Sequence, residues 1–261
     1  MELRVEGKKV YAATGGKPFD PALPAIVFIH GAGMDHTVWA LQTRWFAWHG
    51  RAVLAVDAPG HGRSEGPALD SIEALAEWVF ALLDAAGAKN AALVGHSMGA
   101  LIALEAAARR PEQVRALALC GCAAEMPVSE KLLSAGLAGE HVAYEMITAW
   151  GLGRRAQVGG AEAPGTWMAG GTLRLLEHGR KGVVGIDLRA CDRYKGSAAA
   201  VQKVKVPTVL VLGSHDRMSP AKAAAPLARI PESQTIVIEQ AGHMMMTEQP
   251  GRTLDALRSI L

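Results

Sequence analysis

A sharp corner between a strand and a helix, with a serine at its apex, is the feature that most constrains how this chain can fold. Residues 91–94 form a short apolar run, the sequence GHSMG follows at residues 95–99, and a helical run of Ala and Leu comes next. Turning a strand into a helix within about five residues forces Ser97 into a strained backbone conformation. The positions two residues away must then be nearly free of side chain, and Gly95 and Gly99 meet that demand. The pattern predicts a serine hydroxyl presented above a sheet edge, over free N–H groups at the start of a helix.

The rest of the chain alternates between strand-like and helical segments. After a hairpin at residues 2–13, apolar and β-branched runs predict strands at 25–29, 52–56, 91–94, 114–120, 206–212 and 234–239. Helical spacing predicts helices at 38–48, 71–86, 221–230 and about 252–261, the second of them capped by Ser71. This alternation indicates an α/β fold, with a mostly parallel central sheet covered by helices on both faces.

A different pattern interrupts the alternation between about residues 124 and 204. Helical segments broken by glycine replace the strands there, and a strand pattern returns at residues 206–212. We therefore predict a core in two parts, residues 1–123 and 205–261, with a helical cap inserted at residues 124–204. A chain of 261 residues is long enough for one α/β unit of this size.

Composition argues against several classes of protein. The net charge is only +2 and no basic stripe appears, so we expect no nucleic-acid partner. No apolar segment is long enough to span a bilayer, and residues 1–10 lack the apolar core of a signal peptide, so we expect a cytoplasmic protein. Cys120, Cys122 and Cys191 are expected to be reduced thiols, without the further Cys or His clustering of a zinc site. We predict neither a metal nor a cofactor.

Two segments that follow later strands carry the side chains that a nucleophilic serine needs. A serine hydroxyl becomes nucleophilic when a base removes its proton, and a third group must orient that base. Asp216 follows the strand that ends at Leu212, and His243 follows the strand that ends near Glu239. Serine, aspartate and histidine thus occur in the order expected for such a corner. We predict that Ser97, His243 and Asp216 form a catalytic triad.

Other histidines and aspartates are weaker candidates. His96 adjoins the serine but is expected to point away into the sheet, in a structural role. His215 precedes the candidate acid instead of following the last strand, so it ranks below the candidate base. Asp57 ends a strand at the same sheet edge, whereas Asp187 and Asp192 lie in the predicted cap. None of the three aspartates lies in a loop as suitable as the one after residue 212.

Backbone N–H groups are predicted to stabilise negative charge on a substrate oxygen. Such charge needs hydrogen-bond donors that are already in place. The N–H of Met98, directly after the serine, is the first predicted donor. The second is the N–H of Ala32, in the sequence HGAG at residues 30–33, because small residues let this backbone approach a substrate.

A dinucleotide site is an alternative interpretation of the same loop. Gly31 and Gly33 follow a strand and precede a helix, and Asp57 ends the next strand, as such a site requires. The third glycine of that pattern is missing, because His36 occupies its position. The serine-based interpretation is therefore favoured.

These motifs together resemble those of the α/β-hydrolase superfamily. They are HGAG at 30–33, DAPGHGRS at 57–64, GHSMG at 95–99, Asp216, and Gly-His at 242–243, in family order over nearly the whole chain. Within the superfamily the chain is similar to small, cofactor-free bacterial esterases, enol-lactonases, carbon–carbon bond hydrolases and non-haem haloperoxidases. Epoxide hydrolases and haloalkane dehalogenases have Asp where Ser97 stands, which counts against both. The fold itself hosts many chemistries.

The leading hypothesis is a serine esterase that acts on small-molecule carboxylic esters with short to medium acyl chains. A lactone or carbon–carbon bond hydrolase with the same triad is the second, with a substrate carboxylate held by an arginine of the cap: Arg154, Arg155, Arg189 or Arg193. The third is a ligand receptor of the same fold that turns over slowly. Substrate size is expected to be set by apolar residues, some of which could line the acyl pocket: Leu132, Leu133, Met146, Trp150, Trp167 and the methionines at 244–246.

Overall fold

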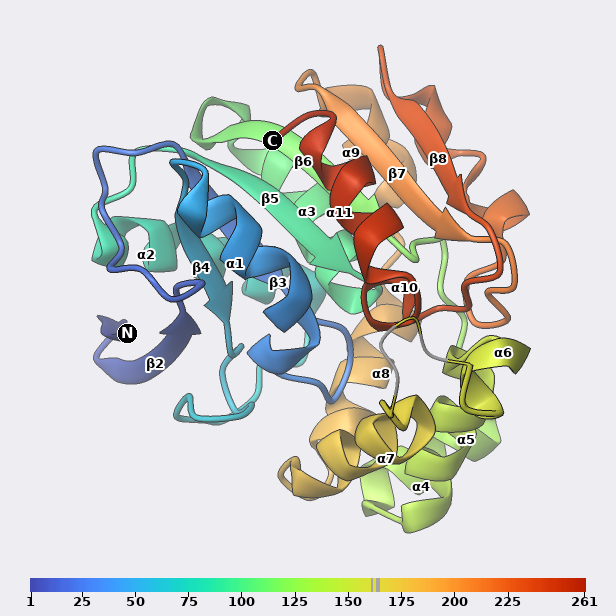
Figure 1. Ribbon diagram of the computed structural model, residues 1–261. Helices are drawn as coiled ribbons and strands as arrows, with labels where there is room; N and C mark the ends of the chain where they lie inside the picture. Colours follow the sequence, from blue (N-terminus) through green and yellow to red (C-terminus); the bar gives the residue numbers. More distant parts are fainter. Residues whose placement is uncertain (161, 163–164) are drawn as a thin grey trace.

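An eight-stranded sheet forms the centre of the computed structural model, which describes residues 1–160, 162 and 165–261 (Figure 1). The strand order is β1-β2-β4-β3-β5-β6-β7-β8. The strands are β1 (Glu2–Val5), β2 (Lys8–Ala13), β3 (Ala25–Ile29), β4 (Ala52–Val56), β5 (Ala91–His96), β6 (Val114–Cys120), β7 (Thr208–Gly213) and β8 (Gln234–Ile238). Every strand that the sequence predicts is therefore present, with small shifts at the ends.

The sheet is parallel from β4 through to β8. Only β1 and β2, the predicted hairpin with Gly7 at its turn, run antiparallel at one margin. Strands β3, β5, β6, β7 and β8 all end at the same edge, and the loops that carry the predicted site residues leave the sheet there. In open parallel sheets this carboxyl edge is where ligands bind. The predicted α/β fold with a mostly parallel sheet is confirmed.

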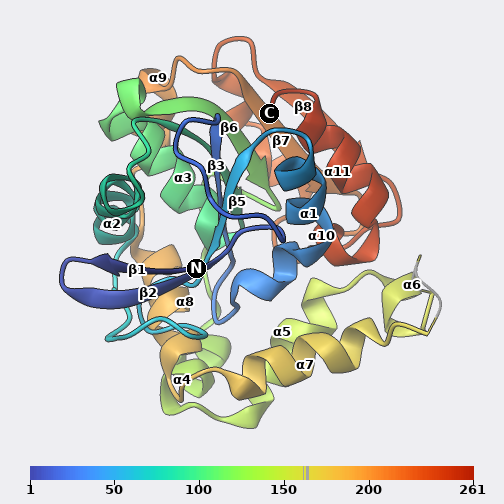
Figure 2. The same cartoon turned by 60° about the vertical axis from the view of Figure 1, so that its left-hand side comes forward.

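Helices cover both faces of the sheet. Figure 2 shows α2, α3 and α9 on one side and α1, α10 and α11 on the other. Their bounds are α1 (Ala40–Trp48), α2 (Ile72–Ala86), α3 (Met98–Arg109), α9 (Ser197–Lys203), α10 (Met245–Glu248) and α11 (Pro250–Arg258). The predicted N-cap of helix α2 is present, because the Ser71 hydroxyl accepts a hydrogen bond from the N–H of Ala74 at 3.2 Å.

The central strands are buried on both faces, which explains their continuous apolar runs. All five residues of β3 are buried. Successive side chains of a strand point to opposite faces. Accordingly, Val27 and Ile29 lie in the apolar core beneath α2 and α3, whereas Ile26 and Phe28 lie in the core beneath α1 and α11. A sheet with two apolar faces needs both helical layers.

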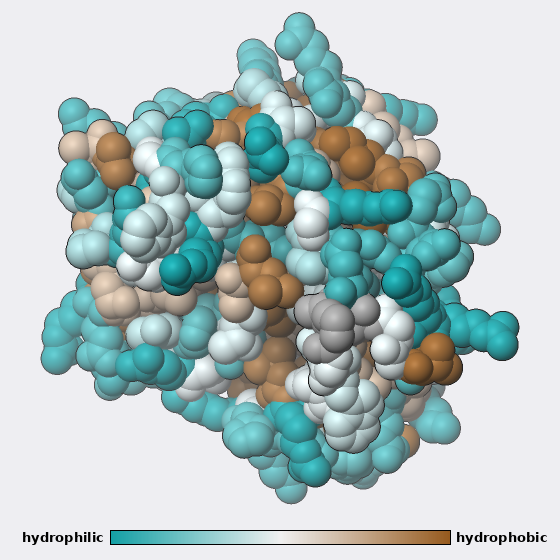
Figure 3. All heavy atoms as spheres, viewed as in Figure 1, coloured by the Kyte–Doolittle hydropathy of each residue, from teal (hydrophilic) through white to brown (hydrophobic). Residues whose placement is uncertain are grey.

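The chain leaves the sheet after β6 and, in the residues that the structure describes there, forms six helices before it returns as β7. They are α4 (Glu130–Ala138), α5 (His141–Gly151), α6 (Arg154–Gln157), α7 (Met168–His178), α8 (Val183–Arg193) and α9. Helices α4 to α7 lie below the carboxyl edge of the sheet, and Figure 3 shows apolar side chains at the surface where they meet it. We keep the word cap for residues 124–204, whose boundaries stay a prediction. Among the described residues, no helix is both long and apolar enough to cross a membrane.

One predicted helix, at residues 221–230, is wrong. The structure has two short 3₁₀ turns there, Ala221–Ala224 and Leu227–Arg229. Pro226 lies between them. A proline within a helix lacks the N–H that the helix needs, and its ring collides with the carbonyl four residues earlier. Small and apolar residues made this segment look helical, but the proline divides it.

Candidate active site

The corner between β5 and α3 has the strained geometry that its sequence predicts. Ser97 has φ 54° and ψ −116°, an uncommon conformation for a residue with a side chain. A Cβ atom added at Gly95 would lie 2.0 Å from the carbonyl oxygen of Gly99, and one added at Gly99 would lie 2.4 Å from that of Ile29. Both distances are impossible for carbon, so only glycine fits at either position.

His243 and Asp216 meet at the same edge of the sheet. The Nδ1 atom of His243 lies 2.8 Å from Oδ2 of Asp216, and both side chains are buried. The other carboxylate oxygen, Oδ1, accepts the N–H groups of Met218 and Ser219 at 2.9 and 2.8 Å. The carboxylate is therefore locked in one orientation by its own loop, with one oxygen turned towards the imidazole. An acceptor at Nδ1 leaves Nε2 available as a base.

Backbone contacts hold His243 in place. Its N–H donates to the carbonyl of Gly151 at 2.8 Å, and Nε2 of His96 lies 2.9 Å from its carbonyl oxygen. A Cβ at Gly121 would be 3.1 Å from the Nδ1 atom of His243, so the imidazole lies directly against that glycine. These contacts fix the ring that Asp216 orients.

The expected direction of His96 is wrong. Its ring does not turn away from the site but packs on His243, with ring centroids 4.7 Å apart, and it lines a cavity that Ser97 and His243 also border. Burial, followed by the proximity of His243, holds the pKa of His96 well below its usual range, so the ring is neutral. A neutral ring that donates from Nε2 to the His243 carbonyl has a structural role, as the sequence predicts.

Ser97 and His243 both line a cavity of about 250 Å³. Most of its wall is apolar and comes from the cap and from the loop after β7; it includes Met126, Val128, Leu132, Ile147, Trp150, Leu188 and Met218. Ala32 and Met244 also line it. In the part of the chain that the structure describes, the Ser97 hydroxyl donates to no side chain, so the predicted contact between serine and imidazole is not made in this conformation. Such contacts are often long in ligand-free sites and tighten when substrate binds.

Ala32 is the residue of the 31–33 loop that lines this cavity. The N–H of Gly33 is bonded to the carboxylate of Asp187 at 2.7 Å. The carbonyl of Gly31 accepts hydrogen bonds from the Nδ1 atom of His30 at 2.8 Å and from the N–H of Met34 at 3.2 Å. The N–H of Ala32 has no partner among the described residues, so it can donate to an oxygen bound in the cavity. On the other side, Met98 is the first residue of α3, whose N–H has no partner within the helix.

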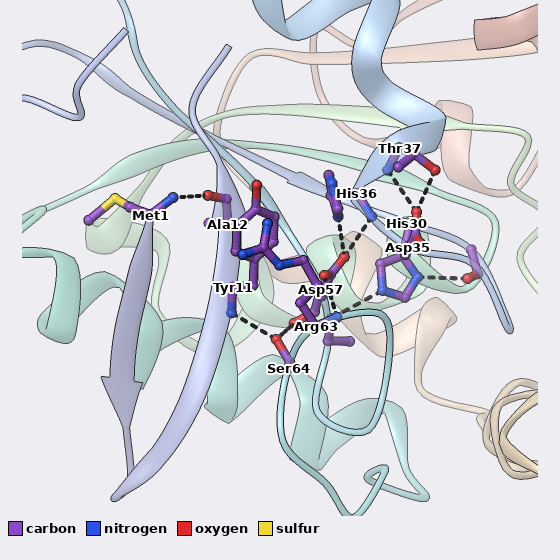
Figure 4. A network of polar contacts seen from close by, with 12 residues as sticks. Met1, Tyr11, Ala12, His30, Asp35, His36, Thr37, Asp57, Arg63 and Ser64 are labelled. Atoms are coloured by element: carbon purple, nitrogen blue, oxygen red, sulfur yellow. Dashed lines mark hydrogen bonds and ion pairs between the residues drawn. The ribbon is translucent and has the colours of Figure 1, made fainter. Parts of the chain in front are cut away.

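Asp57 is committed to the internal structure of its loop (Figure 4). Its Oδ1 accepts the backbone N–H of His36 and lies 2.7 Å from the Nδ1 atom of the same residue. Its Oδ2 accepts the N–H of Arg63 at 2.9 Å. Burial raises the pKa of Asp57, but these hydrogen bonds outweigh it and the net pKa is lowered. A carboxylate engaged in this way is not available to a ribose, which counts against the dinucleotide interpretation.

The same cluster is the one group of potential metal ligands among the described residues. Ligand atoms of Asp35, His36 and Asp57 lie within 4.8 Å of one another. However, Asp35 caps the following turn by accepting the N–H of Thr37 at 2.8 Å, and the other two side chains bond to each other. These residues satisfy one another and do not fit a metal site.

Sequence reasoning missed Glu248, a buried carboxylate behind the His243 loop. Its oxygens accept the N–H of Gly242 at 3.0 and 3.1 Å and the N–H of Gly153 at 2.9 Å. Burial raises its pKa, although the hydrogen bonds partly offset this effect. Glu248 thus ties the loop that carries His243 to the cap. No local pattern marks it, because its partners are revealed only when the chain folds.

The other predicted residues differ in whether they reach the cavity. His215 is exposed, and Asp192 accepts the N–H of Val128 at 2.9 Å. Leu132 and Trp150 line the cavity, whereas Trp167 is 70% exposed. The described lining includes none of the four cap arginines suggested as carboxylate anchors; the arginine in it is Arg217, next to the candidate acid.

The fold and the candidate site, at the carboxyl edge of a mostly parallel sheet, are those of a hydrolase. The model of the Alpha/beta hydrolase family matches residues 26–256, and the chain belongs to that family.

Individual relatives agree with this assignment. The putative carbamate hydrolase RutD of Klebsiella pneumoniae subsp. pneumoniae is 30% identical over 249 residues, which cover 85% of each protein. The structure of a thermophilic esterase superposes with a TM-score of 0.81 at 26% identity, over 99% of this chain and 95% of that one. The crystal structure of the enol-lactonase from Burkholderia xenovorans LB400 has a TM-score of 0.85 at 21% identity, over 100% of this chain and 99% of that one, and supports the fold.

Proposed function

We propose that this hydrolase cleaves small carboxylic esters with short to medium acyl chains, with Ser97 as nucleophile, His243 as base and Asp216 as the group that orients the base. The observation that carries the proposal is the buried 2.8 Å contact between His243 and Asp216 beside a cavity that Ser97 also lines. The likeness to a thermophilic esterase and to a putative carbamate hydrolase supports acyl transfer as the reaction class.

In the first half of the proposed reaction, Nε2 of His243 takes the hydroxyl proton of Ser97 while Oγ bonds to the ester carbonyl carbon. The carbonyl oxygen becomes an oxyanion, which accepts hydrogen bonds from the N–H groups of Met98 and Ala32. The carbon–oxygen bond to the alcohol then breaks, and His243 gives its proton to the departing alkoxide. The acyl group stays on Ser97 as an ester.

In the second half, water replaces the alcohol. His243 removes a proton from the water, whose oxygen bonds to the acyl carbon. The bond to Oγ then breaks, and His243 returns the proton to Ser97 as the carboxylic acid leaves. The buried Asp216 carboxylate stabilises the imidazolium in both halves.

The cavity predicts a limit on acyl length. Each buried methylene is worth about 0.8 kcal/mol only while it stays inside an apolar wall. For nitrophenyl esters from acetate to palmitate, we expect kcat/KM to peak at about eight carbons or fewer, because the cavity of about 250 Å³ is small. Trp150→Ala should move the peak to longer chains, because Trp150 lines the cavity.

The matched control is Trp167→Ala, because Trp167 is 70% exposed and absent from the described lining. We expect it to leave the chain-length profile unchanged. A wild-type maximum at palmitate, or equal shifts in the two tryptophan variants, would contradict the proposed substrate range. A lactone or a ring-fission dienoate turned over much faster than any linear ester would favour the second hypothesis for the same triad.

A further inference from the structure

Asp187 is a buried carboxylate that reaches from helix α8 to the 31–33 loop. It is fully buried, and it lies in the cap, 154 residues away from Gly33. Its Oδ2 accepts the Gly33 N–H at 2.7 Å and lies 2.8 Å from Nε2 of His61. Its Oδ1 is buried and has no partner among the described residues. Burying a charged group is costly unless it is paired, and the proposed ester hydrolysis does not use the Asp187 carboxylate.

His61 is the cation that pairs with this carboxylate. Its Nε2 faces Asp187, and its Nδ1 lies 3.1 Å from the carbonyl oxygen of Pro59. The Pro59 carbonyl and an ionised Asp187 carboxylate can only accept hydrogen bonds, so beside that carboxylate each ring nitrogen carries a hydrogen and the ring is an imidazolium. Burial lowers the pKa of His61, but Asp187 and Pro59 outweigh burial and the net pKa is raised. Asp187 and His61 therefore form a buried ion pair between cap and core.

Helix α8 contacts Gly33 at a second point, one turn before Asp187. Gly33 has φ +68°, and a Cβ atom added there would lie 2.4 Å from Cγ2 of Val184. The helix therefore packs directly on the Cα atom of Gly33 while Asp187 holds its N–H. Gly33, which follows the candidate oxyanion donor Ala32, is thus held by two contacts from the cap.

We propose that Asp187 is a positioning residue that aims the N–H of Ala32 at the substrate oxygen, an inference that rests on the proposed function. The hydrogen bond from His30 fixes the peptide group between Gly31 and Ala32. The hydrogen bond to Asp187 fixes the next peptide group, between Ala32 and Gly33. Because peptide groups are planar, the first anchor holds the plane that contains the Ala32 N–H, and the second holds the following plane and so restricts rotation about both Ala32 dihedrals. The cap thus completes the oxyanion site as well as covering the cavity.

Three variants test this role. Asp187→Ala removes the acceptor of the Gly33 N–H. In Asp187→Asn the amide oxygen can replace Oδ2, while the NH₂ group occupies the place of Oδ1, where no hydrogen bond is lost. Asp192→Ala is the matched control, because Asp192 lies on the same helix and also binds a backbone N–H, that of Val128, but does not touch the 31–33 loop.

For Asp187→Ala we expect kcat on nitrophenyl acetate to fall about 10- to 100-fold with KM changed less than about threefold, because the affected interaction strengthens in the transition state. Affinity for a trifluoromethyl ketone, which forms an oxyanion on the serine, should fall in parallel with kcat/KM. Asp192→Ala should keep the kcat of the wild type. A folded Asp187→Ala protein that keeps wild-type kcat, or loses kcat but not ketone affinity, would overturn the proposal.

Amide hydrogen exchange at Gly33 provides a readout that needs no turnover. A neutral amide is a weaker acceptor than a carboxylate. We therefore expect exchange at Gly33 to be about three- to tenfold faster in Asp187→Asn than in the wild type, and unchanged in Asp192→Ala. Equal exchange in the wild type and Asp187→Asn would overturn the proposal even if Asp187→Ala does not fold. A wild-type protein that hydrolyses no ester would instead refute the proposed function, whatever the exchange shows.

Discussion

Replacing Ser97 with alanine should lower kcat for a short nitrophenyl ester by about four to six orders of magnitude. The variant keeps His243, Asp216 and the backbone donors, so only the group that forms the acyl-enzyme is lost. Alanine has the same Cβ atom as serine, so the strained corner at φ 54° should still form. Initial rates at saturating ester, with protein carefully freed of contaminating esterases, measure the effect.

Ser129→Ala is the control for this substitution. Ser129 also lines the cavity, but its hydroxyl accepts the N–H of Leu132 and caps helix α4. Losing that hydrogen bond at the N-terminus of α4 should cost about 1 kcal/mol of folding stability and leave kcat within about tenfold of the wild type. Similar losses in the two variants, or normal turnover in Ser97→Ala, would count against Ser97 as nucleophile.

Asp216→Asn should lower kcat by about three to four orders of magnitude, although the side chain keeps nearly the same shape. The reason lies in the two backbone N–H groups, of Met218 and Ser219, that bind Oδ1. They select the amide oxygen for that position, so the NH₂ group must face Nδ1 of His243. The imidazole then has to accept at Nδ1 and carry its hydrogen on Nε2, which leaves no base for Ser97.

Because the loop keeps both backbone hydrogen bonds, we expect the unfolding temperature of Asp216→Asn to stay close to that of the wild type. Asp192→Asn provides the comparison, since this carboxylate also binds a backbone N–H but has no imidazole partner. Its kcat should remain near that of the wild type. If Asp216→Asn keeps more than about a tenth of wild-type kcat, another group orients His243 and the assignment of Asp216 is wrong.

The sequence was sufficient to predict the sheet and the three candidate side chains. Parallel strands end at one edge, so residues that follow β5, β7 and β8 are brought together by topology alone. Ser97 is recognisable for a local reason, because a strand that turns into a helix around it needs glycine on both sides. The loop of Asp216 and the loop of His243 follow from the strand ends.

The supporting contacts could not be predicted, because they join distant segments. Asp187 and Gly33 are 154 residues apart in the sequence, and Glu248 and Gly153 are 95 residues apart. A lone aspartate within a helix carries no sign of the backbone N–H that it will bind. The predicted direction of the His96 side chain is wrong because a strand pattern does not show that His243 packs on its ring.

Labelling with a fluorophosphonate tests the central claim most directly. This reagent forms a stable phosphonyl ester with an activated serine, and peptide mass spectrometry identifies the labelled residue. We predict a single adduct on the peptide that contains Ser97, formed rapidly in the wild type and at least about a hundredfold more slowly in Asp216→Asn. An adduct on any other residue, or ester turnover that continues after Ser97 is fully labelled, would contradict the account.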